Sequence, residues 1–143
     1  MVPGGGCCAL IHVVRVAAGS NARTVLPFTG LFGPDDAAVN AAGDVFIVDD
    51  DRVLKLAAGS NTQVVLPFTD LKGVVDVAVD HAGNVYAIDS GHDRVVELAA
   101  GTNTQSIVPI AGLYHPVGVA VDTAGNVYVV DAGNKRVIEL AAS

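Results

Sequence analysis

Acidic side chains gather in two short runs in the first part of the chain. Asp49, Asp50 and Asp51 are consecutive, and the pair Asp35-Asp36 precedes them. Clustered carboxylate oxygens are the ligands that Ca²⁺ prefers. A calcium loop, however, carries acidic or amide side chains at alternate positions and ends on a Glu, and this pattern is absent here. We therefore expect no metal site and no cofactor, and we interpret Asp49 as a structural residue.

A second pattern pairs an Asp with an Arg a few residues later. It occurs three times, in the pairs Asp49–Arg52, Asp89–Arg94 and Asp131–Arg136. Three equivalent catalytic arginines would serve no chemical purpose, whereas an ion pair that closes a hairpin is needed once in every copy of a repeat. The sequence therefore predicts three structural Asp–Arg pairs.

Other reactive side chains form no recognisable motif. No two histidines have the spacing of metal ligands on one element, and all four occupy unrelated places: His12, His81, His92 and His115. The adjacent Cys7 and Cys8 would bridge only through a strained ring, so we expect no disulfide. Glycine-rich phosphate loops and protein-kinase motifs are also missing. We predict that the chain is not an enzyme.

The elements that position these residues come from an internal repeat. The run Leu-Ala-Ala-Gly-Ser-Asn at Leu56–Asn61 returns almost unchanged at Leu98–Asn103 and begins again at Leu140–Ser143. An earlier copy lies at Val16–Asn21. The second, third and fourth copies are 42 residues apart. A period of this length is typical of propellers and solenoids, in which each unit packs on the next.

Each repeat has the pattern of four short strands, here named A to D. In the clearest copy they are expected at residues 76–80, 85–89, 94–98 and 104–109, and Gly- or Asn-containing turns separate them. The β-branched residues are dense, and no period of 3.6 is sustained, so helices are not expected. Strands A and B are apolar on both faces, which indicates sheets covered on both sides. Radially packed propeller blades have this property, and strand A would line their hub.

A family resemblance follows from the same segments. Residues 116–137, Pro-Val-Gly-Val-Ala-Val-Asp-Thr-Ala-Gly-Asn-Val-Tyr-Val-Val-Asp-Ala-Gly-Asn-Lys-Arg-Val, resemble an NHL repeat. With the flanking Val-Leu-Pro-Phe-Thr-Gly-Leu and Leu-Ala-Ala-Gly-Ser-Asn-Thr-Gln pieces, residues 13–143 are similar to the extracellular β-propeller sensor domain of a mycobacterial receptor Ser/Thr protein kinase. That domain has six blades. The resemblance implies an all-β propeller that binds or senses a partner without catalysis.

Counting strands predicts half of such a ring. Residues 1–11 match nothing in the repeat, residues 12–28 form a partial blade, and about three NHL blades follow near residues 29–69, 70–110 and 111–143. Three blades cannot close, because a propeller needs at least four. We expect a homodimer that completes a six-bladed propeller. In it, residues 24–28 of one copy would lie beside residues 135–140 of the other, and residues 10–16 would be displaced.

The loops of one rim vary, whereas those of the other rim hardly change. The A–B turns repeat Ala-Gly-Asn with little change, but the B–C loops and the D–A loops at residues 30–36, 70–75 and 112–117 differ between copies. Loops that are free to differ are where binding sites are usually built, although neutral drift would give the same pattern. We predict that an unknown protein or glycan partner binds there, through Phe32, Asp35, Asp36, Lys72, Val74, Tyr114 and His115.

Charge and hydropathy narrow the function further. The net charge of −7 disfavours nucleic acid, which needs a basic surface. No apolar run is long enough to span a bilayer, and the first residues do not resemble a signal peptide, so we expect no membrane insertion and leave the location open. Two alternatives to a binding scaffold remain. One is a propeller enzyme similar to streptogramin lyases or lactonases, which the Val- and Ala-rich strand A disfavours. The other is a truncated, non-functional fragment of a receptor-kinase sensor domain.

Overall fold

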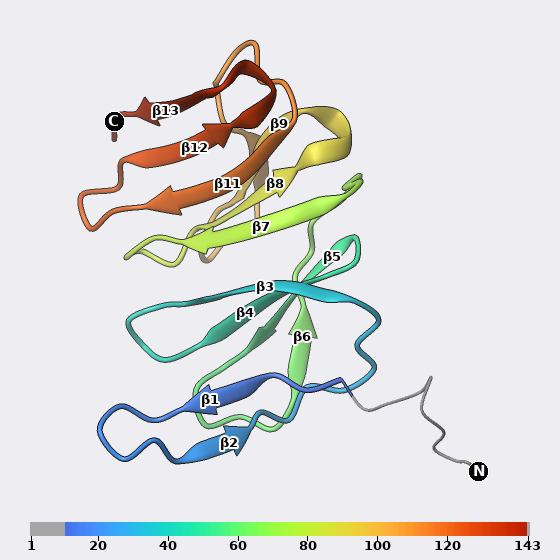
Figure 1. The fold of residues 1–143 in the computed structure, drawn as a ribbon, viewed down its shortest axis with the longest axis vertical. Helices are drawn as coiled ribbons and strands as arrows, with labels where there is room; N and C mark the ends of the chain where they lie inside the picture. Colours follow the sequence, from blue (N-terminus) through green and yellow to red (C-terminus); the bar gives the residue numbers. More distant parts are fainter. Residues whose placement is uncertain (1–10, 143) are drawn as a thin grey trace.

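Valine-rich strands and glycine-centred turns divide the chain into four antiparallel sheets (Figure 1). The computed structural model describes residues 11–142. Within them lie a two-stranded hairpin, two four-stranded sheets and a three-stranded sheet. The strands are β1 Val14–Val16, β2 Arg23–Val25, β3 Pro34–Val39, β4 Val45–Asp49, β5 Arg52–Leu56, β6 Gln63–Val65, β7 Val74–Val79, β8 Val85–Asp89, β9 Arg94–Leu98, β10 Gln105–Ile107, β11 Pro116–Val121, β12 Val127–Asp131 and β13 Arg136–Leu140.

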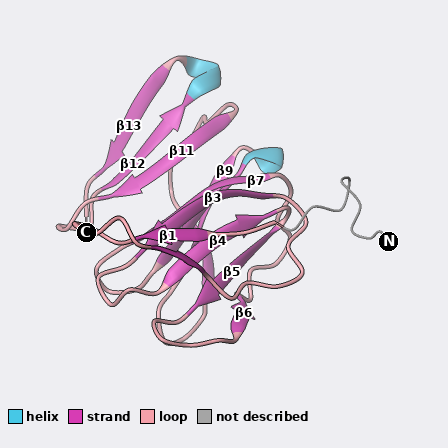
Figure 2. Ribbon diagram, turned by 60° about the horizontal axis from the view of Figure 1, so that its bottom comes forward, coloured by secondary structure: helices cyan, strands magenta, loops and turns pink. Residues whose placement is uncertain are grey.

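Each sheet follows the chain as a simple meander. The first full sheet is ordered β3-β4-β5-β6, the second β7-β8-β9-β10, and the third β11-β12-β13. Each first strand has a register shift at the same place, between Pro34 and Asp36, between Val74 and Asp76, and between Pro116 and Gly118. Two short 3₁₀ turns, Ser90–His92 and Ala132–Asn134, connect β8 to β9 and β12 to β13 (Figure 2).

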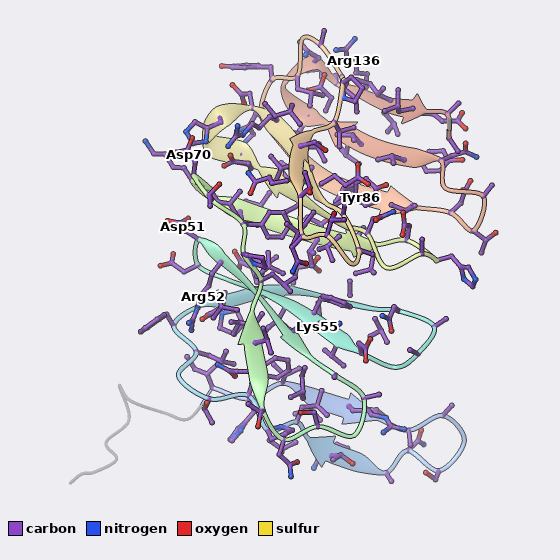
Figure 3. The ribbon with its side chains drawn as sticks, turned by 180° about the vertical axis from the view of Figure 1, so that it is seen from behind. Asp51, Arg52, Lys55, Asp70, Tyr86 and Arg136 are labelled. Carbon is purple, nitrogen blue, oxygen red and sulfur yellow. The ribbon has the colours of Figure 1, made fainter. Side chains whose placement is uncertain are left out.

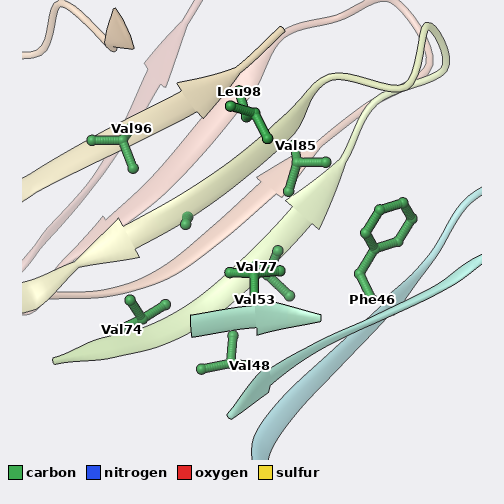
Figure 4. Packing of buried hydrophobic residues seen from close by; sticks show 9 residues of the cluster. Phe46, Val48, Val53, Val74, Val77, Val85, Val96 and Leu98 are labelled. Atoms are coloured by element: carbon green, nitrogen blue, oxygen red, sulfur yellow. The ribbon is translucent and has the colours of Figure 1, made fainter. Parts of the chain in front are cut away.

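The sheets stack face to face in chain order, and both faces of the inner sheets are buried. Phe46, Val48 and Val53 of the first full sheet pack on Val77 and neighbouring residues of the second (Figure 4). A similar cluster joins the second sheet to the third, and a smaller one joins the hairpin to the first full sheet. The apolar pattern of strands A and B therefore has the predicted cause, which is burial between neighbouring sheets.

The nearly constant A–B turns, Ala-Gly-Asp in the first full sheet and Ala-Gly-Asn in the other two, owe their sequence to hydrogen bonds within one rim. Asp80 Oδ1 accepts the backbone N–H of Asn84 at 2.8 Å, and Gly83 takes a φ of 95°, where other residues are strained. The Asn84 side-chain oxygen then accepts the N–H of Ala100 in the next turn of the sheet at 2.8 Å. The side chains of Asp80 and Asn84 accept backbone N–H groups, and Gly83 permits a positive φ, so the sequence of this rim has little freedom to change. We call it the framework rim.

Two predictions concern residues that lie wholly or partly outside the described part of the chain. The irregular segment expected at residues 1–11 lies outside it except for its last residue, and Cys7 and Cys8 lie outside it too. Among residues 11–142, no helix is long and apolar enough to cross a membrane.

Candidate functional site

The rim opposite the framework rim is organised around three buried aspartates. Each second strand ends in an Asp whose residue is 0% exposed, namely Asp49, Asp89 and Asp131. One carboxylate oxygen of each accepts a backbone N–H from the loop that leads into the same sheet. The donors are Phe32 N at 2.9 Å and Gly33 N at 2.8 Å to Asp49, Lys72 N at 2.7 Å to Asp89, and Tyr114 N at 2.8 Å to Asp131. Each Asp therefore fixes the backbone of the loop, at two adjacent residues for Asp49 and at one residue for Asp89 and Asp131.

The second oxygen of each carboxylate meets an arginine from the next strand. The distances are 2.7 Å from Arg52 Nη2 to Asp49, 2.8 Å from Arg94 Nε to Asp89, and 2.7 Å from Arg136 Nε to Asp131. Each arginine also donates through Nη2 to a carbonyl of the same loop, at Gly30, Asp70 or Gly112. The structure thus brings together all three Asp–Arg couples that the spacing suggested, and it adds the loop as a third member.

The surrounding donors keep these carboxylates ionised. Burial is the largest single influence and raises the pKa of Asp89, but the Lys72 N–H, Arg94 and His92 together outweigh it and leave the pKa below its ordinary value. The pKa of Asp49 is lowered by the same balance, in which burial opposes Arg52 and the loop N–H groups. A carboxylate held in this way is a structural anchor rather than a proton donor at neutral pH.

The loop positions fixed by the buried aspartates present exposed side chains. Phe32 is 72% exposed and Tyr114 is 63% exposed, and Lys72 in the equivalent place is exposed as well. The Arg52 guanidinium carbon lies 5.1 Å from the centre of the Phe32 ring. We name this surface, made by Phe32, Lys72 and Tyr114, the variable rim. Because the backbone of these loop positions is already held in place, a ligand that binds here has only side chains left to order.

Glycines in the 3₁₀ turns hold two of these loops more closely. Gly91 N donates to Lys72 O at 2.7 Å, and Gly133 N donates to Tyr114 O at 2.8 Å. A Cβ added to Gly91 would lie 2.5 Å from Lys72 O, so only glycine allows this approach. Figure 3 shows Asp51, Arg52 and Asp70 along the edge that carries these loops.

Neighbouring sheets are also tied together along the variable rim. Asp51 Oδ1 accepts the N–H of Gly73 at 2.7 Å, and Asp93 Oδ1 accepts the N–H of His115 at 2.8 Å. His115 has a φ of 54°, and its side chain is exposed. Two of the three carboxylates in the acidic run at residues 49–51, those of Asp49 and Asp51, therefore accept backbone hydrogen bonds. Among the described residues, no group of three or more His, Cys, Asp or Glu side chains is placed to hold a metal ion.

Three predicted binding residues lie in strands rather than loops. Asp35 and Asp36 belong to β3, and Val74 begins β7. The prediction of Val74 as an exposed binding residue is wrong, because Val74 is 3% exposed and packs in the core between two sheets. The first strand of each sheet begins before its register shift, so its start was mistaken for loop.

The sequence reasoning also missed a pair of carboxyl groups on the inner strands. Asp36 and Asp76 occupy the same place in adjacent sheets. Asp36 Oδ2 accepts the N–H of Val77 at 3.3 Å, and Asp76 Oδ2 accepts the N–H of Val119 at 2.7 Å. Burial, followed by the contact with Asp36, raises the pKa of Asp76 to about 7. The signal that was available is the shared register of the two aspartates, 40 residues apart.

Comparisons with known proteins support the fold. A family model described as NHL repeat matches residues 113–139. A search of curated proteins finds no match. Similar solved structures include a virginiamycin B lyase from Staphylococcus aureus, with 14% identity over 77% of this chain and 41% of that one at a TM-score of 0.58. A chain of a nidogen–laminin complex has 14% identity over 91% of this chain and 58% of that one at a TM-score of 0.69.

A third similar structure is an auxiliary nutrient binding protein from Bacteroides ovatus ATCC 8483. It has 15% identity over 92% of this chain and 33% of that one, at a TM-score of 0.68. The chain therefore spans only about one third to three fifths of the proteins that it resembles. At this identity the likeness concerns the fold alone. The prediction of an all-β, NHL-type β-propeller with about three blades is confirmed.

Proposed function

We propose that this chain is a non-enzymatic binding or sensing scaffold that engages a protein or glycan through the variable rim. One observation carries the proposal. The backbone N–H of Phe32, Lys72 and Tyr114 is held by a buried carboxylate in each sheet, while the side chain at that position is exposed and differs from sheet to sheet. A fixed backbone with a changeable side chain is suited to recognition.

The chemistry of the variable rim suits a protein surface or a sugar. Exposed aromatic rings such as Phe32 and Tyr114 supply rigid, largely apolar contact area, and aromatic residues are enriched at binding hot spots. Lys72 adds a cation between them in the order of the repeats. Two of the similar structures bear names of binding proteins, the nidogen–laminin complex and the nutrient binding protein. The resemblance to a receptor-kinase sensor domain agrees with the same proposal.

The experiment compares variants of the variable rim on a glycan array and on an array of extracellular proteins. We expect Tyr114→Ala and Phe32→Ala to weaken binding by about 30-fold, the usual effect of removing a hot spot of about 2 kcal/mol. Thr123→Ala, an exposed position in a turn of the framework rim, is the matched control. Equal binding by the Tyr114 variant, or a loss with Thr123→Ala alone, would place the site elsewhere.

A second candidate function is catalysis at the hub, as in the lyases of the same fold. The observation that favours it is the Asp36–Asp76 pair on the inner strands, because a carboxyl group with a pKa of about 7 can exchange a proton at neutral pH. One of the similar lyase structures contains quinupristin. Chromatography of quinupristin incubated with the chain tests this candidate. Turnover that Asp76→Asn abolishes would support the lyase function, and no turnover would reject it for this substrate.

A further inference from the structure

The third sheet exposes apolar side chains at positions that the inner sheets bury. Val137 is 67% exposed, but the residues in the same register of the other two sheets, Val53 and Val95, are 0% exposed. Val130 is 41% exposed, against 0% for its equivalents Val48 and Ile88. In the inner sheets the next sheet covers these positions. The third sheet therefore has the surface of a blade that lacks its neighbour.

The opposite end of the stack has the complementary gap. Val14 and Val16 of the hairpin are 48% and 58% exposed, but their equivalents Leu54 and Leu56 in the first full sheet are 0% and 4% exposed. The hairpin supplies only strands of types C and D. Beside it lies a cavity of about 590 Å³, lined by Val13, Leu26, Ala37, Val39, Val45 and Leu56 among others. This cavity is where the A and B strands of a complete blade would pack.

We infer that the third sheet of a second copy of this chain docks into this cavity and that two copies close a six-bladed ring. The occupant follows from the repeat itself. Each junction between sheets within the chain seats a face like that of Val130 and Val137 against a face like that of Val39, Val45 and Leu56. The hairpin and the third sheet lie at opposite ends of the stack (Figure 1), so a two-fold axis brings each end to the other.

The length of the chain supports a second copy as the partner. The chain covers 41% of a similar virginiamycin B lyase and 46% of a similar streptogramin B lyase, so two copies supply about the length of one such protein.

Closure requires one strand to be exchanged. The outer edge of β13 has no partner strand among the described residues, and the position beside it corresponds to β6 and β10 in the other sheets. In the ring, β2 of the other copy takes this position beside β13. To do so, β2 of that copy gives up its pairing with its own β1, which β13 displaces. β1 is suited to displacement because its three residues are exposed. His12 also stands where the other strands of type C carry the Arg of the Asp–Arg pair, so β1 lacks that anchor.

Light scattering on the intact 143-residue chain, over a range of concentrations, tests the inference. The expected mass is about twice 14.5 kDa. Val137→Glu should raise the dimer dissociation constant by about 100-fold or more, because the charge would be buried at the junction. The matched control is Ile107→Glu. Ile107 is 59% exposed, and its equivalents Val65 and Val25 are exposed by 52% and 55%, so this position faces solvent in every copy.

Further variants separate ring closure from other associations. A double change, Val14→Asp with Val16→Asp, should leave the dimer intact, because β1 is displaced in the ring. Loss of the dimer in this variant would overturn the strand exchange. A wild-type monomer with a sharp melting transition would overturn the dimer, as would a mass that keeps growing with concentration. An equal dimer in Val137→Glu, judged folded by its circular dichroism, would place the contact elsewhere.

Discussion

Replacing Arg94 by Ala measures what an Asp–Arg pair contributes to the second sheet. Arg94 is the least exposed of the three arginines, with a side chain that is 20% exposed, and its partner Asp89 is 0% exposed. The change removes the 2.8 Å bond from Nε to Asp89 and the 2.9 Å bond from Nη2 to Asp70 O. Asp89 keeps the Lys72 N–H at 2.7 Å and His92 at 2.8 Å.

The expected loss in the free energy of unfolding is about 2–4 kcal/mol. A hydrogen bond to a charged group contributes about 1.5–3 kcal/mol, and the bond to the exposed Asp70 adds about 0.5 kcal/mol. Leaving a buried charge without any partner costs about 3–5 kcal/mol. We expect a smaller loss here, because Asp89 retains two hydrogen-bond partners. For a chain of this length, the melting temperature should fall by roughly 7–13 °C.

Urea unfolding followed by circular dichroism, at one protein concentration, is the assay. Arg136→Ala is the matched control and should lose less, because its side chain is 47% exposed. The pKa of Asp89 is lowered in the folded state, so the contribution of the pair is present above pH about 4, the unfolded value, and is lost as the pH falls through the folded one. An unchanged midpoint for Arg94→Ala, or a difference from wild type that does not shrink as the pH is lowered below about 4, would refute the reasoning.

Three further predictions concern pH and the glycine turn. The pKa of Asp76 is about 7 in the folded chain and about 4 when unfolded, so stability should fall as the pH rises through this range, and Asp76→Asn should remove that fall in urea titrations at several pH values. As the pH decreases below about 4, stability should also decrease, because Asp49 and Asp89 become protonated. The wild-type plot of stability against pH should therefore have a maximum. Gly91→Ala should destabilise by about 1–3 kcal/mol, because the new Cβ would meet Lys72 O, whereas Gly33→Ala, with open space, should not.

The repeat made much of this architecture predictable. A 42-residue period fixes the size of one unit, and glycine-containing turns divide it into strands. The Asp–Arg spacing is also informative. Asp89 ends β8 and Arg94 begins β9, and the two residues are opposite each other in this antiparallel hairpin. Contacts within a single hairpin follow from local spacing, so their partners can be named before the structure is known.

Contacts between sheets were harder to foresee. Asp36 and Asp76 meet because two first strands lie side by side without a shared hydrogen-bond ladder, and no local pattern records such a neighbour. The start of β7 at Val74 was missed for a related reason. Between Val74 and Asp76, β7 has one residue more than the facing part of β8. This register shift interrupts the alternation of side chains that is typical of a strand.

The buried aspartates explain how one rim can vary while the fold stays constant. On the framework rim, turn side chains such as Asp80 and Asn84 satisfy the backbone, so changing the turn removes its own support. On the variable rim, the hydrogen bonds that hold the loop backbone come from a strand residue outside the loop. Asp89 accepts the backbone N–H of residue 72, and this bond does not depend on the side chain at position 72. Selection on a partner can therefore act on that side chain at little cost in stability. This separation of backbone support from side-chain identity is the physical basis for our proposal that the variable rim binds a partner.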